Sequence, residues 1–135
     1  MHCEEAERGE EPVSGETSAR ITAFLTDLRE ALEGAGDPAR AEQQRAYLKS
    51  EMAMYGVGVP GTRRLARRAA GAHADLWAEA ATWEVALRRL WAEAAHREER
   101  YAALAIIRSK PSVSHAGRME SLALYEHFLR TGQWW

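Results

Sequence analysis

Hydrophobic residues recur at helical spacing near the start of the chain. Between residues 17 and 32 they fall at i, i+3, i+4, i+7 and i+11, which is the pattern of one buried helix face. The residues of this stripe are Ile21, Phe24, Leu25, Leu28 and Leu32. The pattern predicts a helix over residues 17–32 that is ended by Gly34 and Gly36.

The pair Asp37-Pro38 predicts the start of a second helix. An aspartate side chain can cap the first turn, and proline suits the first helical position. The helix is expected to reach about residue 52, with Ala41, Gln44 or Arg45, Leu48 and Met52 on one face.

A bend is predicted at residues 55–59, Tyr-Gly-Val-Gly-Val. Glycine adopts backbone angles that a side chain forbids, so the chain can turn sharply at Gly56 and Gly58. Pro60 then opens a third helix that runs to about residue 70 and stops at Gly71.

The second half of the chain continues the helical pattern. Residues 73–81 permit a short helix or a turn, and Thr82 is the expected N-cap of a helix with Trp83, Leu87, Leu90, Trp91 and Ala94 on one face. A helix over residues 97–109 follows and ends at Pro111, its apolar positions being Tyr101, Leu104, Ala105 and Ile107 or Arg108. Ser114 is expected to cap a last helix that reaches about residue 130, ends at Gly132 and offers for burial Met119, Leu122, Ala123, Phe128 and Leu129.

No segment alternates with a period of two, so the expected fold class is all-α. Six or seven helices joined by short connections form consecutive hairpins, and the hairpins repeat about every 40 residues, the period of two-helix solenoid repeats of the HEAT and armadillo kind. An ordinary compact helical bundle is the alternative.

Composition adds a charge asymmetry. The formal net charge is −2, but residues 1–16 hold six acids and one base, which leaves 17 bases against 14 acids in residues 17–135. We expect residues 1–16 to be a disordered acidic tail and residues 17–135 to be one helical domain. The single cysteine, Cys3, excludes an internal disulfide, and the absence of an apolar span or signal-peptide core favours a cytoplasmic protein without membrane contact.

Basic side chains cluster on the third predicted helix. Arg63, Arg64, Arg67 and Arg68 recur at i, i+1, i+4 and i+5, so four guanidinium groups share one side of the helix. Phosphate is one candidate partner, because guanidinium matches it with two parallel hydrogen bonds. A solvated polar face is the alternative interpretation.

No complete active site is visible in local motifs. The five histidines lack metal-ligand spacing, no phosphate or dinucleotide loop is present, and no cofactor is expected. Trp77, Trp83 and Trp91 are interpreted as core residues. The adjacent pair Trp134-Trp135 follows a helix end, so one indole could be displayed for stacking, or both could plug the end of the core.

Three stretches resemble the DNA alkylation repair family of HEAT-like glycosylases. Residues 46–67, AYLKSEMAMYGVGVPGTRRLAR, carry Tyr47, Lys49, Gly56, Val57, Pro60 and Arg63 in the family's order. Residues 87–110, LRRLWAEAAHREERYAALAIIRSK, resemble its next repeat. The terminal LRTGQWW resembles its Trp-Trp pair.

The resemblance implies a right-handed stack of about three helix pairs whose concave basic face holds alkylated duplex DNA. It also implies removal of N3- and N7-alkylated purines, in which a carboxylate stabilises the developing oxocarbenium sugar. Tyr47 matches a tyrosine of the concave face, Trp135 matches the tryptophan beside the lesion, and Lys49 and Arg63 fit phosphate-binding or structural roles. The expected DNA-binding residues are Tyr47, Lys49, Arg63, Arg67, Trp134 and Trp135.

The sequence departs from the family pattern at its end. The family's catalytic aspartate would follow four residues after the position that matches Trp135, where this sequence stops. We therefore expect the N-terminal half of such a glycosylase, with no catalytic residue in this chain and no activity alone; a non-catalytic repeat module that binds DNA or a protein is the alternative. A last repeat without a neighbour is expected to expose Met119, Leu122, Phe128, Trp134 and Trp135 and to favour self-association.

Overall fold

The computed structural model describes residues 14–132, and this part of the chain is helical. Its α-helices are α2 (Gly15–Ala35), α3 (Pro38–Leu48), α4 (Val59–Ala72), α5 (Ala80–Ala92), α6 (Arg97–Ile107), α7 (Val113–Ala116) and α8 (Leu122–Thr131). Short 3-10 helices cover Ala74–Trp77, Lys110–Ser112 and Met119–Ser121. Among the described residues the only β-type pairing is an isolated bridge between Ala53 and His96, which confirms the all-α class.

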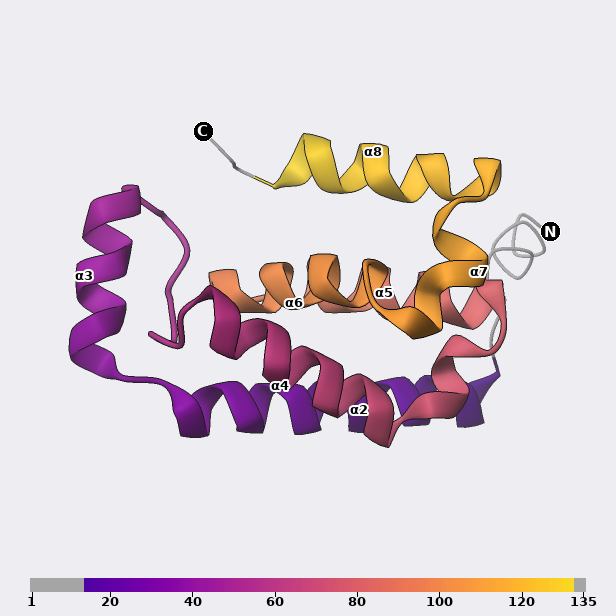
Figure 1. Ribbon diagram of the computed structural model, residues 1–135, viewed down its shortest axis with the longest axis horizontal. Helices are drawn as coiled ribbons and strands as arrows, with labels where there is room; N and C mark the ends of the chain where they lie inside the picture. Colours follow the sequence, from indigo (N-terminus) through magenta and orange to yellow (C-terminus); the bar gives the residue numbers. More distant parts are fainter. Residues whose placement is uncertain (1–13, 133–135) are drawn as a thin grey trace, which may run out of the picture.

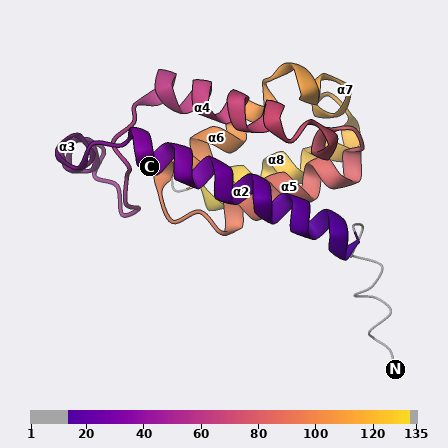
Figure 2. The same cartoon turned by 90° about the horizontal axis from the view of Figure 1, so that it is seen from below.

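The helices are arranged in layers (Figure 1). Helix α4 packs against both α2 and α6, while α5 packs against α2, α6 and α8. Helix α3 stands apart at one end of the molecule, as the view from below also shows (Figure 2). The arrangement as a HEAT-like solenoid, with a compact helical bundle as the alternative, stays a prediction.

The hydrophobic stripe of α2 forms the base of the core, as predicted. Ile21, Phe24, Leu25, Leu28 and Leu32 are all buried. The three tryptophans interpreted as core residues are also buried, and each indole N–H donates a hydrogen bond: Trp77 to the Ala70 carbonyl, Trp83 to the Ser112 hydroxyl and Trp91 to the Thr131 hydroxyl. Trp91 stacks on Phe128 with ring centroids 4.0 Å apart, which joins α5 to α8.

Helix α3 departs from its prediction. Its start is confirmed, because the Asp37 side chain accepts hydrogen bonds from the backbone N–H groups of Ala39 and Arg40. It ends at Leu48 rather than near residue 52, because Lys49 adopts a left-handed backbone conformation with φ 53°. None of its residues is buried, so the face predicted from Ala41 to Met52 does not enter the core.

The predicted last helix is broken in two. Ser114 lies inside the short helix α7 instead of capping a long helix, and α8 begins only at Leu122. The His115 carbonyl accepts hydrogen bonds from the Arg118 N–H and the Ser121 hydroxyl, which holds the chain in a turn after α7. Of the apolar residues that this helix was predicted to bury, only Phe128 is buried. The other four, Met119, Leu122, Ala123 and Leu129, are exposed.

Other boundaries shift less. Helix α5 begins at Ala80 with Glu79 as its N-cap, not after Thr82, and α2 begins at Gly15 with the Ser14 side chain as its cap. Residues 14–16 of the predicted disordered tail are therefore ordered by this helix start, and residues 1–13 lie outside the described residues. None of the described helices is long and apolar enough to cross a bilayer.

A candidate nucleic-acid interface

The glycine bend between α3 and α4 is built by close backbone approach. Gly56 and Gly58 have φ angles of +87° and +91°, in the region that glycine tolerates best. A Cβ atom on Gly56 would lie 2.2 Å from the Asp37 carbonyl oxygen. The Asp37 N–H donates to the Tyr55 carbonyl, so the two ends of the α3 excursion are held together. The predicted bend is confirmed, and it sets the direction in which α4 leaves.

A buried carboxylate from α6 holds this bend in place. Glu98 is 1 % exposed, and it accepts hydrogen bonds from the backbone N–H groups of Tyr55 (2.9 Å), Gly56 (3.0 Å) and Val57 (3.3 Å). Three donors around one carboxylate satisfy a charge that burial would otherwise penalise strongly. The sequence analysis did not single out Glu98, although its position one residue into α6 places it beside the bend.

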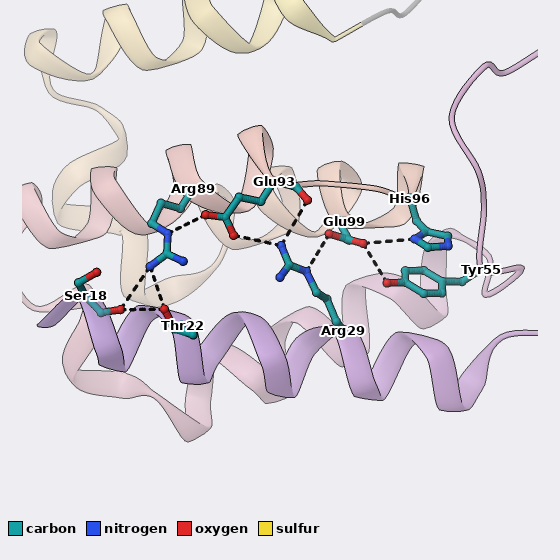
Figure 3. A network of polar contacts seen from close by, with 8 residues as sticks. All are labelled: Ser18, Thr22, Arg29, Tyr55, Arg89, Glu93, His96 and Glu99. Atoms are coloured by element: carbon teal, nitrogen blue, oxygen red, sulfur yellow. Dashed lines mark hydrogen bonds and ion pairs between the residues drawn. The ribbon is translucent and has the colours of Figure 1, made fainter. Parts of the chain in front are cut away.

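The neighbouring residue, Glu99, is the centre of a second polar network (Figure 3). Its carboxylate is also 1 % exposed, and it accepts hydrogen bonds from Arg29 of α2 (3.1 Å) and from the Tyr55 hydroxyl (2.9 Å). Burial first, and then the hydrogen bond to Glu99, raise the pKa of Tyr55, so its hydroxyl stays a donor. The Tyr55 ring stacks on His96 at a centroid distance of 3.8 Å. These contacts fix the bend to α2 and α6.

The arginine helix α4 divides into two faces. Its inner face is made of small side chains, Thr62, Ala66, Ala69 and Ala70, which are buried and allow α4 to lie close to α6. Its outer face carries Arg63, Arg64, Arg67 and Arg68, which are all exposed. The guanidinium groups of these four arginines have no hydrogen-bond or ion-pair partner among residues 14–132.

A groove runs between α4 and α6 as three adjoining depressions. The first has a volume of about 220 Å³ and lies between the end of α3 and the start of α4. The second, of about 330 Å³, shares Val59 and Tyr101 with it, and the third, of about 400 Å³, shares Arg108 with the second. The cationic residues that line the groove are Arg63, Arg67, Arg108 and Lys110.

The predicted site residues are distributed unevenly around this groove. Arg63 and Arg67 line the second and third depressions, and Tyr47, which is 86 % exposed, lines the first. Lys49 is exposed at the end of α3 but lines none of the three depressions. Trp134 and Trp135 lie outside the described residues.

The structure adds residues that the sequence analysis did not assign to the site. Of the two alternatives Ile107 and Arg108 for the apolar face of α6, Arg108 is wrong, because its side chain is exposed and lines the groove. Lys110 joins it from the following 3-10 helix, and Tyr101 lies in the wall between the first two depressions. The sequence Arg108-Ser109-Lys110 indicates a second basic segment. Its position in the groove follows only from the packing of α6 against α4, which the sequence pattern does not reveal.

Within residues 14–132 no group of three or more His, Cys, Asp or Glu side chains could hold a metal ion. The groove carries four cations, two from α4 and two from the segment that follows α6.

These features define an all-helical protein with a cationic groove between two closely packed helices. Comparison with family models matches residues 28–135 to the family described as DNA alkylation repair enzyme. The match covers most of the chain, and the chain belongs to this family. No curated protein and no solved structure gives a significant match. Family membership points to a role in DNA repair.

Proposed function

We propose that this chain binds duplex DNA through the groove between α4 and α6, as part of the repair of alkylated bases. The observation that supports the proposal most strongly is that the cations of the groove are not paired with carboxylates. Arg63, Arg67, Arg108 and Lys110 have no acidic partner within the described part of the chain. Elsewhere on the surface seven arginines pair with carboxylates: Arg20, Arg29, Arg45, Arg88, Arg89, Arg118 and Arg130.

An unpaired row of cations along a groove favours a polyanion. Each phosphate contact releases counterions from DNA, so a cationic row gains affinity without reading the base sequence. Arginine also binds phosphate with two hydrogen bonds, which fixes the position of the backbone. The exposed Tyr47 ring at one end of the groove adds a surface on which a sugar or base could rest.

The finer part of the proposal concerns the reaction. We propose that the repair activity is that of a glycosylase that excises N3- and N7-alkylated purines, and that the layered helices are HEAT-like pairs. Two buried carboxylates, Glu98 in the lining of the first depression and its neighbour Glu99, are both engaged by structural hydrogen bonds. The proposal therefore assigns DNA binding, and not the chemical step, to the described residues. A non-catalytic module that binds DNA or a protein partner is the second candidate, favoured by the same engagement of both carboxylates.

The test of binding is the salt dependence of affinity for a fluorescent duplex. The logarithm of the affinity of wild-type protein should fall linearly with the logarithm of the salt concentration. Each phosphate contact contributes about one to this slope, so the double variant Arg63→Ala/Arg67→Ala should have a slope that is shallower by about two. The matched control is Arg88→Ala/Arg130→Ala, which removes two arginines that already pair with acids on their own helices. An unchanged slope in the groove variant would show that Arg63 and Arg67 do not contact phosphate.

The reaction is tested separately with duplex that contains N7-methylguanine. Chromatographic detection of the free base would support a glycosylase activity of this chain, and retained binding without base release would agree with the assignment of DNA binding, and not the chemical step, to the described residues.

A further inference from the structure

The positive charge of the groove is concentrated at one end. The third depression, with a volume of about 400 Å³, is lined by three of the four groove cations, Arg67, Arg108 and Lys110. Among the described residues, none that lines the second or the third depression is acidic. Neighbouring like charges repel one another, so an acidic group that reaches this end of the groove is attracted to it.

The negative charge of the chain is concentrated before Ser14. Residues 1–13, here called the acidic segment, hold one base, Arg8, and five acids, Glu4, Glu5, Glu7, Glu10 and Glu11. Its formal side-chain charge is therefore −4 (one base minus five acids), which is equal in size and opposite in sign to the four groove cations. The rest of the chain has a formal charge of +2 (−2 minus −4). Terminal blocks of like charge often act as interaction segments, and the complementary surface here belongs to the same chain.

Helix α2 begins at the end of the molecule at which α4 ends (Figure 1, Figure 2). Contacts along the chain agree with this view. Arg20 of α2 lies 3.7 Å from the carboxylate of Asp75 in the 3-10 helix Ala74–Trp77, and the Trp77 indole of that helix donates to the Ala70 carbonyl. Ala70 lines the third depression. The N-terminal part of α2 and the wall of this depression therefore contact the same short helix.

The acidic segment is long enough to reach the third depression. Arg20 follows Ser14 by six residues, which corresponds to about 9 Å of helix. A chain of 13 residues spans up to about 45 Å, several times that length. A tethered segment meets a nearby site at an effective concentration of the order of millimolar, so weak charge attraction is enough to occupy it.

We propose that the acidic segment lies against the cationic end of the groove when no DNA is bound, and that DNA phosphates displace it. The proposal rests on the proposed function for the identity of the competing ligand. It adds regulation of that site: carboxylates and phosphates compete for the same cations, so the segment weakens DNA binding. Salt screens the attraction of the segment as well as that of DNA. The weakening should therefore be largest at low salt.

The contact itself is tested without DNA. Cys3 is the only cysteine of the chain, so a nitroxide spin label can be attached there without any substitution. NMR spectra should show broadened amide signals for Arg67 and Lys110 at low salt, and the broadening should decrease on addition of salt or of unlabelled duplex. The matched control is the acidic-segment variant Glu4→Gln/Glu5→Gln/Glu7→Gln/Glu10→Gln/Glu11→Gln, which keeps the length and the label and should lose most of the broadening. Equal broadening in wild type and variant would overturn the contact.

The competition is tested by affinity for a fluorescent duplex at about 0.1 M salt, where charges more than about 10 Å apart are largely screened. The acidic-segment variant should bind about three- to tenfold more tightly than wild type, and the difference should shrink as salt rises. A charge-matched control removes five exposed acids that line none of the three depressions, Glu30→Gln/Glu33→Gln/Glu51→Gln/Glu79→Gln/Glu120→Gln, and should change affinity less than about twofold.

The outcomes separate this proposal from the proposed function. Salt-dependent duplex binding that is equally tight in wild type and the acidic-segment variant would overturn the competition and leave the duplex interface intact. An equal gain in both glutamine variants would also overturn it, because net charge alone would then explain the effect. Broadening that depends on the glutamates, in a protein that binds no duplex, would support the contact and overturn the duplex interface.

Discussion

Single residues decide the geometry of the segment that presents the groove. Gly56 must approach the Asp37 carbonyl, and the Glu98 carboxylate must accept the N–H groups of the residues around it. Neither requirement concerns contact with a ligand. Both fix where α4 begins, and hence where the arginines of that helix lie relative to α6.

Replacement of Gly56 by alanine should destabilise the protein. The residue has a φ of +87°, and the added Cβ would meet a backbone oxygen that cannot move away as a side chain could. We expect a loss of at least about 2 kcal/mol in the free energy of unfolding. Gly34→Ala is the matched control, because nothing lies within 4 Å of a Cβ there and alanine favours the helix by about 0.5–1 kcal/mol. Urea unfolding of both variants gives the comparison; equal effects would contradict the assigned strain.

Replacement of Glu98 by alanine should be similarly costly. Three backbone N–H groups would lose their acceptor in a buried position, and a loss of about 3 kcal/mol or more is expected from charge-assisted hydrogen bonds of this kind. The control Glu120→Ala removes an exposed acid and should change stability by less than about 0.5 kcal/mol. If urea unfolding found the two variants equally stable, the bend would not depend on this carboxylate.

At the scale of elements, local rules account for some helices and not for others. The stripe of α2 and the Asp37-Pro38 start of α3 follow from side-chain periodicity and capping, which act within a few residues. The turn between α7 and α8 is held by the Ser121 hydroxyl, which donates to the His115 carbonyl and makes no capping hydrogen bond to α8, whereas the capping rule alone favours Ser114. Short-range patterns could not distinguish these two serines.

The contact of α2 with the end of α5 carries a pH dependence. A hydrogen bond from Arg89, supported by the charges of Arg89 and Arg29, lowers the pKa of Glu93 below its ordinary value of 4.5. A carboxyl with a lowered pKa in the folded state stabilises the fold above its ordinary pKa, and this contribution is lost as the pH falls through the lowered value. Wild-type protein should therefore lose more stability than Glu93→Gln when the pH falls from neutral to about 3. Urea unfolding across this range tests it, with Glu30→Gln, an exposed acid of α2, as the control; parallel curves for wild type and Glu93→Gln would contradict the assignment.

At the scale of the whole molecule, the candidate site is only half visible in the sequence. The glycine bend, Pro60 and the spacing of Arg63 and Arg67 predicted a helix with a cationic side from local geometry alone, and this helix forms one wall of the groove. The other wall, with Tyr101, Arg108 and Lys110, arises because α6 packs alongside α4 from about 40 residues away in the sequence. That pairing is a tertiary event, and no spacing rule within either helix encodes it.

A second surface of the whole molecule carries the last prediction, which is self-association. Val113, Met119, Leu122 and Leu129 of the α7–α8 region are 57–77 % exposed, whereas Leu124 and Phe128 on the inner side of α8 are buried. Exposed apolar side chains on consecutive elements favour contact with another molecule, because contact removes their surface from water. We expect sedimentation velocity to show association that increases with concentration, and the double variant Leu122→Gln/Leu129→Gln to reduce it. Leu48→Gln, which changes an exposed leucine on α3, should leave association unchanged. A wild-type protein that sediments as a monomer throughout a dilution series would show that this apolar surface is too small or too divided to drive association by itself.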